Sequence, residues 1–425
     1  MSVKFSSSRG NFSSYGGLGL FSELVSSSSL SRRLKEYLPV GKRRHNIHSD
    51  LKFKTLLYAF GVGGDCLEDI DTFAKDVGFQ AVCKNRVYKS GVYGNFLRSF
   101  DGWQIRGLDK VLRDSAFELR RRAFPEDRDF ILDVDSTFHV QYGRKMEGLA
   151  FDYEKKWGLS SLQAFDQHGI QYAMKVREGN TFTSVGTAEV VRQVFSHMPR
   201  KYHRFMRGDS GMCNFDVMNA CIENDVDFVL AMRANMYRKI KNAQAFWHWK
   251  QSEIKTRDGR ECEITCAPYH PRGFKKAMRV VLIRAKKKNP DMFEKFDHYG
   301  WVTNIGTSEK SDEEIIEFYK KRGNAENFIK ELKNGYDIHH FPCQKLSANK
   351  VYGIIGALAM NFMRVLGRIM HPQGLIYSKK IRFNMIYIGA QVVKKSRYTF
   401  MKISKHKFKE VAYWLSKIKR QVSYT

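Results

Sequence analysis

The sequence predicts an α/β protein in which a mixed sheet flanked by helices follows a helical N-terminal part and is interrupted by a β-rich insertion. Three observations support this fold class. Residues 45–125 show helical spacing, strand-like and helical segments alternate from 130 to 234, and strand-like segments fill 235–310. At 425 residues the chain exceeds what one hydrophobic core normally supports, so several domains are expected.

The N-terminal part divides into a serine-rich stretch and a run of helices. The first 31 residues hold twelve serines and one acid, Glu23, which is typical of a flexible, low-complexity leader. Short polar or glycine breaks separate the helical segments that follow, as in a small helical domain. The last of these segments, residues 108–124, is rich in arginine and indicates contact with phosphate groups.

Strands and helices alternate after residue 130. The apolar, β-branched run "FILDVDSTFHV" indicates a central strand, and two further strands are joined by a hairpin at Gln167–Gly169. An amphipathic helix follows, with Thr183 or Ser184 as its N-cap. A strand, a helix and another strand complete a β-β-β-α-β-α-β order, which implies helices on both faces of the sheet.

The charge balance indicates a polyanionic partner. The chain has 73 Lys and Arg against 44 Asp and Glu, a formal net charge of +29, which favours nucleic acid over a merely solvated basic surface. The seven cysteines are odd in number and scattered, as in a reducing compartment. The apolar run 351–370 contains Asn361, Arg364 and Arg368, so we interpret it as a core helix and expect no membrane partner.

The C-terminal tail, residues 378–425, carries thirteen Lys or Arg against one acid, Glu410. Aromatic side chains are interleaved with these basic residues, which suits a nucleic-acid surface. Packed aromatics with basic, solvent-facing neighbours would give the same pattern, so both interpretations stay open. The aromatic residues are Tyr398, Phe400, Phe408, Tyr413 and Trp414.

The stretch "EFYKKRGNAENFIKELKNGYD", residues 317–337, is predicted to form one helix with a polar face. At 3.6 residues per turn, five side chains fall within a sector of roughly 80° over about 21 Å. One of them is a carboxylate, and the other four offer positive charge or hydrogen bonds. They are Tyr319, Arg322, Glu326, Lys330 and Lys333.

Glu326 is the third member of a candidate metal site. Asp135 follows the apolar part of one strand, and Asp209 ends another in "RGDSG". Carboxylates at the C-terminal edge of an open α/β sheet face the crevice where ligands bind. Three carboxylates suit Mg²⁺ or Mn²⁺, and two such ions could activate a nucleophile and stabilise a leaving oxygen. Asp133 competes with Asp135, because both point to the same side of the strand.

These residues resemble a known family. Tyr319, Arg322, Glu326 and Lys333 fit the YREK signature of the DDE transposases of bacterial insertion sequences. "DVDST" and "RGDSG" are similar to the first and second Asp motifs, which selects Asp135 over Asp133. The Arg-x-Gly-Asn segment in "VREGNTFTSVGTAEVV" and the strand "YGWVTNI" are also similar. The resemblance extends over roughly residues 45–410.

The resemblance implies an RNase H-like core interrupted by a β-strand domain, and cut-and-paste transposition of double-stranded DNA. Asp135, Asp209 and Glu326 would hold Mg²⁺ or Mn²⁺, with two ions expected. Tyr319, Arg322 and Lys333 would contact DNA near the cleaved phosphate; Lys330 is added from helix spacing alone. Family members form dimers on paired ends, bind terminal inverted repeats and join the freed end to target DNA, commonly through hairpin ends.

Some relatives hold a flipped base with a Trp of the insertion, for which Trp247, Trp249 and Trp301 are candidates. A metal-dependent nuclease and a catalytically silent DNA-binding protein remain alternatives. The expected location is the bacterial cytoplasm, at the nucleoid. The predicted divisions are a leader (1–40), a helical DNA-binding domain (41–127), the first part of the core (128–234), the insertion (235–310), the second part of the core (311–375) and a basic C-terminal region (376–425).

Overall fold

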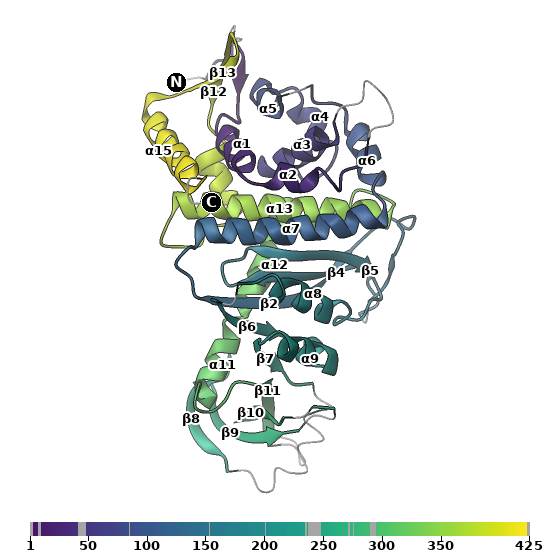
Figure 1. The fold of residues 1–425 in the computed structure, drawn as a ribbon, viewed down its shortest axis with the longest axis vertical. Helices are drawn as coiled ribbons and strands as arrows, with labels where there is room; N and C mark the ends of the chain where they lie inside the picture. Colours follow the sequence, from purple (N-terminus) through teal and green to yellow (C-terminus); the bar gives the residue numbers. More distant parts are fainter. Residues whose placement is uncertain are drawn as a thin grey trace.

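The structure is a computed structural model that has three parts along its long axis. N-terminal helices lie at one end, a sheet with its helices lies in the middle, and a β-rich part lies at the other end (Figure 1). The structure describes residues 3–6, 10–40, 48–84, 86–152, 154–199, 201–233, 236, 248–270, 273–274, 276–289 and 295–422.

One ten-stranded sheet, counted within these ranges, runs through the middle of the molecule and into its β-rich end. Its order is β3-β4-β2-β6-β7-β11-β10-β9-β8, and β5 pairs with β4. Strands β2, β6 and β7 are parallel to one another, β4 is antiparallel to β2, and β5 is antiparallel to β4. The bounds are β2 Asp129–Val140, β3 Ala150–Phe151, β4 Trp157–Asp166, β5 Gln171–Glu178, β6 His203–Gly208, β7 Asp227–Ala231, β8 Lys250–Lys255, β9 Glu261–Tyr269, β10 Met278–Lys286 and β11 Phe296–Thr303.

The strand order confirms the predicted fold class. The path β5-β4-β2-β6-β7, with its last two pairs parallel, is the expected RNase H-like arrangement. The inserted strands do not form a separate sheet, because β11 pairs antiparallel with β7 from Trp301 opposite Ala231 to Thr303 opposite Val229. The insertion therefore extends the central sheet directly.

Helices cover both faces of the sheet, as predicted. The long helices α7 (Gly102–Ala123) and α13 (Leu346–Met370) lie side by side between the sheet and the N-terminal helices, and α8 (Thr187–Phe195) and α9 (Phe215–Glu223) lie on the other side (Figure 1). Helix α13 is long and apolar enough to cross a membrane, but 89% of its most apolar window is buried inside the protein. It is the core helix that the sequence indicated.

The serine-rich N-terminal stretch is not a flexible leader, and that prediction is wrong for residues 10–40. Its leucines and aromatics are spaced to bury one face, and Phe21, Leu24 and Leu30 are fully buried in the same hydrophobic cluster as α13. The serines occupy helix ends and positions between these apolar residues. The elements here are β1 Phe12–Ser13, α1 Leu18–Ser27 and α2 Leu30–Leu34.

The other N-terminal helices pack onto α13 and α7 through that common cluster. Two local expectations are corrected. Arg120 and Arg122 of α7 are structural, because Arg120 pairs with Asp166 and Asp127 while Arg122 pairs with Glu118, all within the protein. Helix α8 begins after Gly186, a left-handed residue at φ 86°, without a side-chain cap. The helices are α3 Ser49–Gly61, α4 Asp69–Phe73, α5 Val77–Cys83 and α6 Ser90–Arg98.

The C-terminal tail returns to the N-terminus. Strand β12 pairs with β1 and with β13, which makes a small three-stranded sheet from the two ends of the chain. Helix α15 then packs against α1 and α13, burying Trp414 and Ile418. The elements are α14 Ser378–Ile381, a π-helical turn Arg382–Ile386, β12 Ala390–Lys395, β13 Tyr398–Ile403 and α15 Lys405–Val422.

Candidate active site

Two of the predicted acids are neighbours in the register of the sheet. The parallel pairing of β2 with β6 ends where Val134 lies opposite Gly208. Asp135 and Asp209 are the next residues on the two strands. Adjacent strands lie about 4.8 Å apart, and residues in register point to the same side, so the pairing places both carboxylates at one point of the sheet edge.

The turn after β6 is held by close contacts. Asp209 Oδ1 accepts a hydrogen bond of 3.2 Å from the amide of Met212, which caps the 3-10 turn η1 (Ser210–Met212). A Cβ on Gly211 would lie 2.6 Å from Thr183 Oγ1 and 3.1 Å from Asp209 Oδ1. Arg233 donates to the carbonyls of Ser210 (3.0 Å) and Gly211 (2.8 Å). The position of the Asp209 carboxylate therefore depends on a glycine at 211.

Glu326 comes from a helix that differs from the one predicted. Residues 317–337 form two helices, α11 (Asp312–Lys320) and α12 (Gly323–Tyr336), with a turn at 321–322. This break means that the predicted continuous polar face does not exist. Glu326 is nevertheless exposed, in the first turn of α12. On its other side α12 is fixed by the buried pair of Glu331 with Arg364 of α13.

The charges of the two other acids act on Asp135. Burial raises the pKa of Asp135 from 3.8 to about 6; Arg322 opposes this rise, whereas the negative charges of Asp209 and Glu326 add to it. Their ligand atoms are not all within 4.8 Å of one another, a spacing found in the described residues only for Asp337, His339 and His340. The site is thus an open cluster in which Asp135 and Asp209 are partly buried and Glu326 is exposed.

Arg322 and Tyr319 border this cluster. Arg322 Nη2 lies 3.1 Å from Asp135 Oδ2, and the arginine side chain is largely buried. Burial raises the pKa of Tyr319 to about 12, so its hydroxyl stays protonated and can donate a hydrogen bond. Tyr319 lies in the last turn of α11 and Arg322 lies in the turn before α12, rather than along one helix face.

The two lysines of the predicted set differ in their surroundings. Lys330 is exposed on α12. Lys333 is half-buried and donates a 3.0 Å hydrogen bond to the carbonyl of Phe138 on β2, and burial lowers its pKa. In this structure Lys333 attaches α12 to the strand that carries Asp135.

Asp133, the competitor of Asp135, has a structural partner. Its carboxylate accepts two hydrogen bonds of 2.7 Å from Arg207, the residue opposite it in register, and both side chains are almost fully buried. Arg207 also donates to the carbonyl of Phe318 in α11 at 2.6 Å. The pair therefore connects two strands and a helix beneath the acid cluster.

Arg177, the arginine of the Arg-x-Gly-Asn segment, is a further residue beside the acids. It donates to Ser136 Oγ (2.8 Å) and Ser160 Oγ (2.9 Å), and to the carbonyl of Val185 (2.6 Å). It thus ties the residue after Asp135 to the loop that contacts Gly211. The signal was the Arg of the Arg-x-Gly-Asn segment, but only the fold shows what it contacts.

A cavity of about 540 Å³ adjoins the acid cluster. The residues that line it include Ser210, which follows Asp209, and Tyr319, together with Phe296, Tyr299 and Trp301 of β11. Trp301 is buried, with its ring 5.7 Å from that of Tyr319. Trp249 packs on Arg284, 4.3 Å from its guanidinium, and Trp247 lies outside the described residues.

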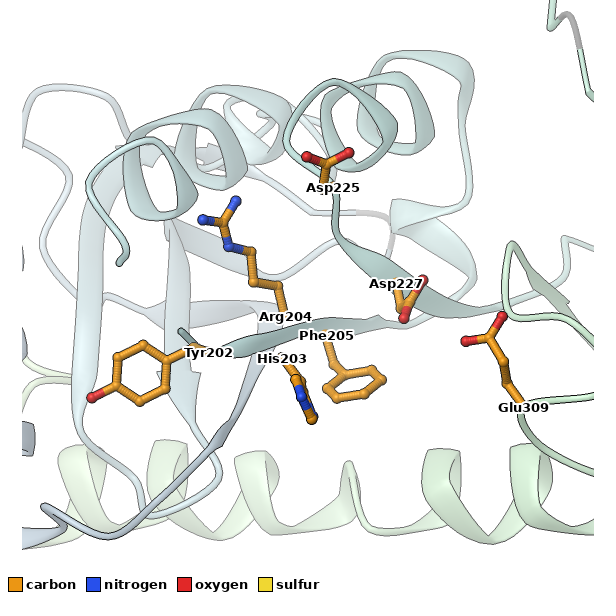
Figure 2. Close-up of a pocket in the computed structure, with 7 residues that line it drawn as sticks. All are labelled: Tyr202, His203, Arg204, Phe205, Asp225, Asp227 and Glu309. Carbon is orange, nitrogen blue, oxygen red and sulfur yellow. The ribbon is translucent and has the colours of Figure 1, made fainter. Parts of the chain in front are cut away.

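A second cavity, of about 570 Å³, lies at the opposite edge of the sheet. It is lined by the first residues of β6 and β7, and Figure 2 shows Asp227 and Glu309 pointing toward each other across it. Burial raises the pKa of Asp227, and the charge of Glu309 adds to this. Because the strands are parallel, this edge is remote from Asp209, so the cavity is not part of the acid cluster.

Comparison with known proteins agrees with the geometry. No curated protein matches the sequence. The model of the family described as "Transposase DDE domain group 1" matches residues 1–422, which includes the N-terminal helices and the tail as well as the catalytic sheet. Such enzymes bind, cut and transfer DNA and generally depend on divalent metal ions. The protein is thus a member of the DDE transposase family.

Proposed function

We propose that this chain mobilises an insertion sequence by cutting DNA at terminal inverted repeats and joining the freed ends to a target. The observations that support this most are the register of β2 with β6, after which Asp135 and Asp209 are neighbours, and the raised pKa of Asp135, to which the charges of Asp209 and Glu326 contribute. The proposed enzyme acts as a homodimer on paired ends, at the nucleoid in a bacterial cytoplasm.

The residues fit a divalent metal. All three ligands are carboxylates, which hard cations such as Mg²⁺ and Mn²⁺ prefer, and the unfavourable charge on Asp135 is what a bound cation would relieve. Asp135, Asp209 and Glu326 would together hold the ions. When bound, the ions supply Lewis-acid activation of the nucleophile and charge stabilisation of the leaving oxygen.

The chain's own groups would position the phosphate. In the proposal, Arg322 releases Asp135 and grips a nonbridging oxygen, because a guanidinium binds phosphate bidentately. Tyr319 donates its hydroxyl proton in a hydrogen bond to the same phosphate, and Lys330 neutralises the adjacent backbone. Lys333 would contact the backbone phosphates only if its hydrogen bond to the Phe138 carbonyl breaks. Trp301 is the best-placed tryptophan to border a flipped base, because it lines the cavity beside Tyr319.

The proposed reaction is a series of phosphoryl transfers. Water attacks a phosphorus at the element's end, the P–O3′ bond breaks, and a 3′-hydroxyl and a 5′-phosphate result. That hydroxyl attacks the opposite strand, which forms a hairpin and releases a 3′-hydroxyl on the flanking DNA. Hydrolysis reopens the hairpin, and the freed 3′-hydroxyl attacks target DNA.

The test uses purified protein, Mg²⁺ and a fragment carrying the element's own terminal repeats. Hairpin-ended products on a denaturing gel are expected. Asp135→Asn, Asp209→Asn and Glu326→Gln should each abolish them while repeat binding persists, and Asp216→Asn, an exposed acid on α9, should not. Nicking without end specificity would favour the nuclease alternative, and binding without cleavage by the unmodified protein would favour the silent binder.

A further inference from the structure

The small sheet formed by the two ends of the chain has two unlike faces. Ser13, Ala390 and Val392 are buried on one face, where α5 packs against β1 and β12. The register determines what the other face carries: Phe12 lies opposite Gln391, Val393 opposite Phe400, and Lys395 opposite Tyr398. Cross-strand partners point to the same side, so these side chains share one face.

Aromatic rings on this second face are open to solvent. Phe12 is 58% exposed, Phe400 is 48% exposed and Tyr398 is 70% exposed. Tyr398 and Phe400 are two residues apart on β13, and their ring centroids lie 6.3 Å apart. Soluble proteins seldom leave several large rings together in water without a use for them.

Cations alternate with the rings. Lys395 pairs with Tyr398 and Lys402 pairs with Gln391, so both lysines project from the aromatic face, and exposed Arg397 lies at the hairpin tip. The whole tail from 378 to 425 has thirteen Lys or Arg and one acid. The face is therefore both aromatic and cationic.

We propose that this face binds single-stranded nucleic acid, with bases stacked on Tyr398, Phe400 and Phe12 and phosphates bound by Lys395 and Lys402. Sheets with exposed aromatic side chains recognise unpaired bases by stacking, and basic neighbours follow the backbone. The site goes beyond the proposed reaction and needs neither the metal nor the acid cluster. It would hold a strand that unpairs during the reaction.

Charge and geometry select this occupant over others. Duplex DNA offers phosphates to the lysines, but its bases are stacked on one another and their faces cannot reach the rings. A second copy of the chain would bring Lys395, Arg397 and Lys402 against the same cations, which repel at this density. A single strand satisfies both the rings and the charges.

The experiment measures fluorescence anisotropy of a labelled twenty-nucleotide oligothymidine and of a twenty-base-pair duplex, with full-length protein in EDTA. The variant Tyr398→Leu with Phe400→Leu keeps apolar, strand-compatible residues but removes both rings. It should bind the single strand at least ten-fold more weakly, with less than a two-fold change for the duplex. The matched control Phe408→Leu, an exposed ring on α15, should bind as wild type.

The charges are tested separately. Lys395→Ala with Lys402→Ala should reduce the slope of log affinity against log salt by about 1.4 for the single strand, and Lys409→Ala with Lys419→Ala on α15 should reduce it less. Asp135→Asn should bind as wild type, so failure of this site is separable from failure of the catalytic proposal.

Three results would overturn the proposal. The first is undiminished single-strand binding by the double leucine variant, and the second is an equal loss for single strand and duplex. The third is a change in sedimentation from dimer to monomer with unchanged binding, which would assign the face to a second copy. If the double variant melts early, Tyr398→Trp, which keeps a ring, must bind at least as tightly as wild type for the proposal to stand.

Discussion

Arg322 Nη2 lies 3.1 Å from Asp135 Oδ2, so one acid of the candidate cluster is paired with an arginine of the same site. The guanidinium partly compensates a carboxylate that burial and two neighbouring acids destabilise. A divalent cation bound to Asp135 would have to act against that positive charge. Arg322 therefore has two proposed roles: it pairs with Asp135 in the metal-free protein, and it binds a phosphate when metal and DNA are present.

Arg322→Gln should separate these two effects. Removing the positive charge should raise the affinity for Mg²⁺ several-fold at pH 8.5, where Asp135 is ionised, because a competing cation is gone. Cleavage should nevertheless fall by about a hundred-fold, because a bidentate phosphate contact is lost. The measurement is the Mg²⁺ dependence of the melting temperature beside a cleavage assay. Lys320→Gln, on the exposed surface of α11, is the control; weaker Mg²⁺ binding by Arg322→Gln would contradict this account.

Asp135→Asn should stabilise the metal-free protein at high pH. The pKa of Asp135 is raised from 3.8 to about 6 on folding, so its contribution to stability is present below pH 3.8 and is lost as the pH rises through 6. The substitution removes that loss. The free energy of unfolding of the variant should therefore exceed that of wild type by about 3 kcal/mol at pH 8 and should be nearly equal to it at pH 4. Urea unfolding in EDTA at the two pH values measures it. Equal stability of variant and wild type at pH 8 would count against the raised pKa.

The same shift predicts how metal binding depends on pH. Carboxylate ligands must be deprotonated to bind a cation, so the increase in melting temperature caused by Mg²⁺ should shrink as the pH falls through about 6. Differential scanning fluorimetry between pH 5 and 8 follows this directly. Asp216→Asn should show the same curve as wild type, whereas Asp135→Asn should show no Mg²⁺ effect at any pH.

Arg207→Met should destabilise the protein without touching the acid cluster directly. It leaves Asp133 buried without its partner, which typically costs about 3–5 kcal/mol of unfolding free energy. The control is Arg192→Met in the half-exposed pair with Glu223, where about 0–1 kcal/mol is expected. Denaturant midpoints compare the two. A similar small loss for both variants would show that the Asp133 pair is not structural.

The sequence could predict that Asp135 and Asp209 would be neighbours, whereas the choice of Asp135 over Asp133 came from the family resemblance. Asp135 and Asp209 lie just after apolar β-runs, and the parallel register then brings them together. Sequence periodicity could not show that Lys321 and Arg322 interrupt a helix, because the residues on both sides have good helical spacing. The break depends on tertiary contacts, among them the hydrogen bond from Arg207 to the Phe318 carbonyl.

The serine-rich N-terminus misled the interpretation for a related reason. The composition is dominated by serine, but the fold depends on the few apolar residues between the serines. Phe21 and Leu24 are completely buried against helices far along the chain. The partner of β1 is β12, nearly 380 residues later, and no local pattern reveals such a pairing. The role of Arg177 was likewise invisible, since its partners come from three separate segments.

Gly211→Ala should disturb the site although it removes no polar group. Its Cβ would lie 2.6 Å from Thr183 Oγ1 and 3.1 Å from Asp209 Oδ1, so the turn or the carboxylate must move. We expect weaker Mg²⁺ binding and at least ten-fold slower cleavage, because an error of about 1 Å at a reacting centre is costly. Gly323→Ala is the matched control, since a Cβ there meets nothing within 4 Å and the residue begins α12. That variant should cleave as wild type and be slightly more stable. If both alanine variants cleave equally well, the Asp209 turn is more tolerant than its contacts indicate, and Gly211 has no part in placing the carboxylate.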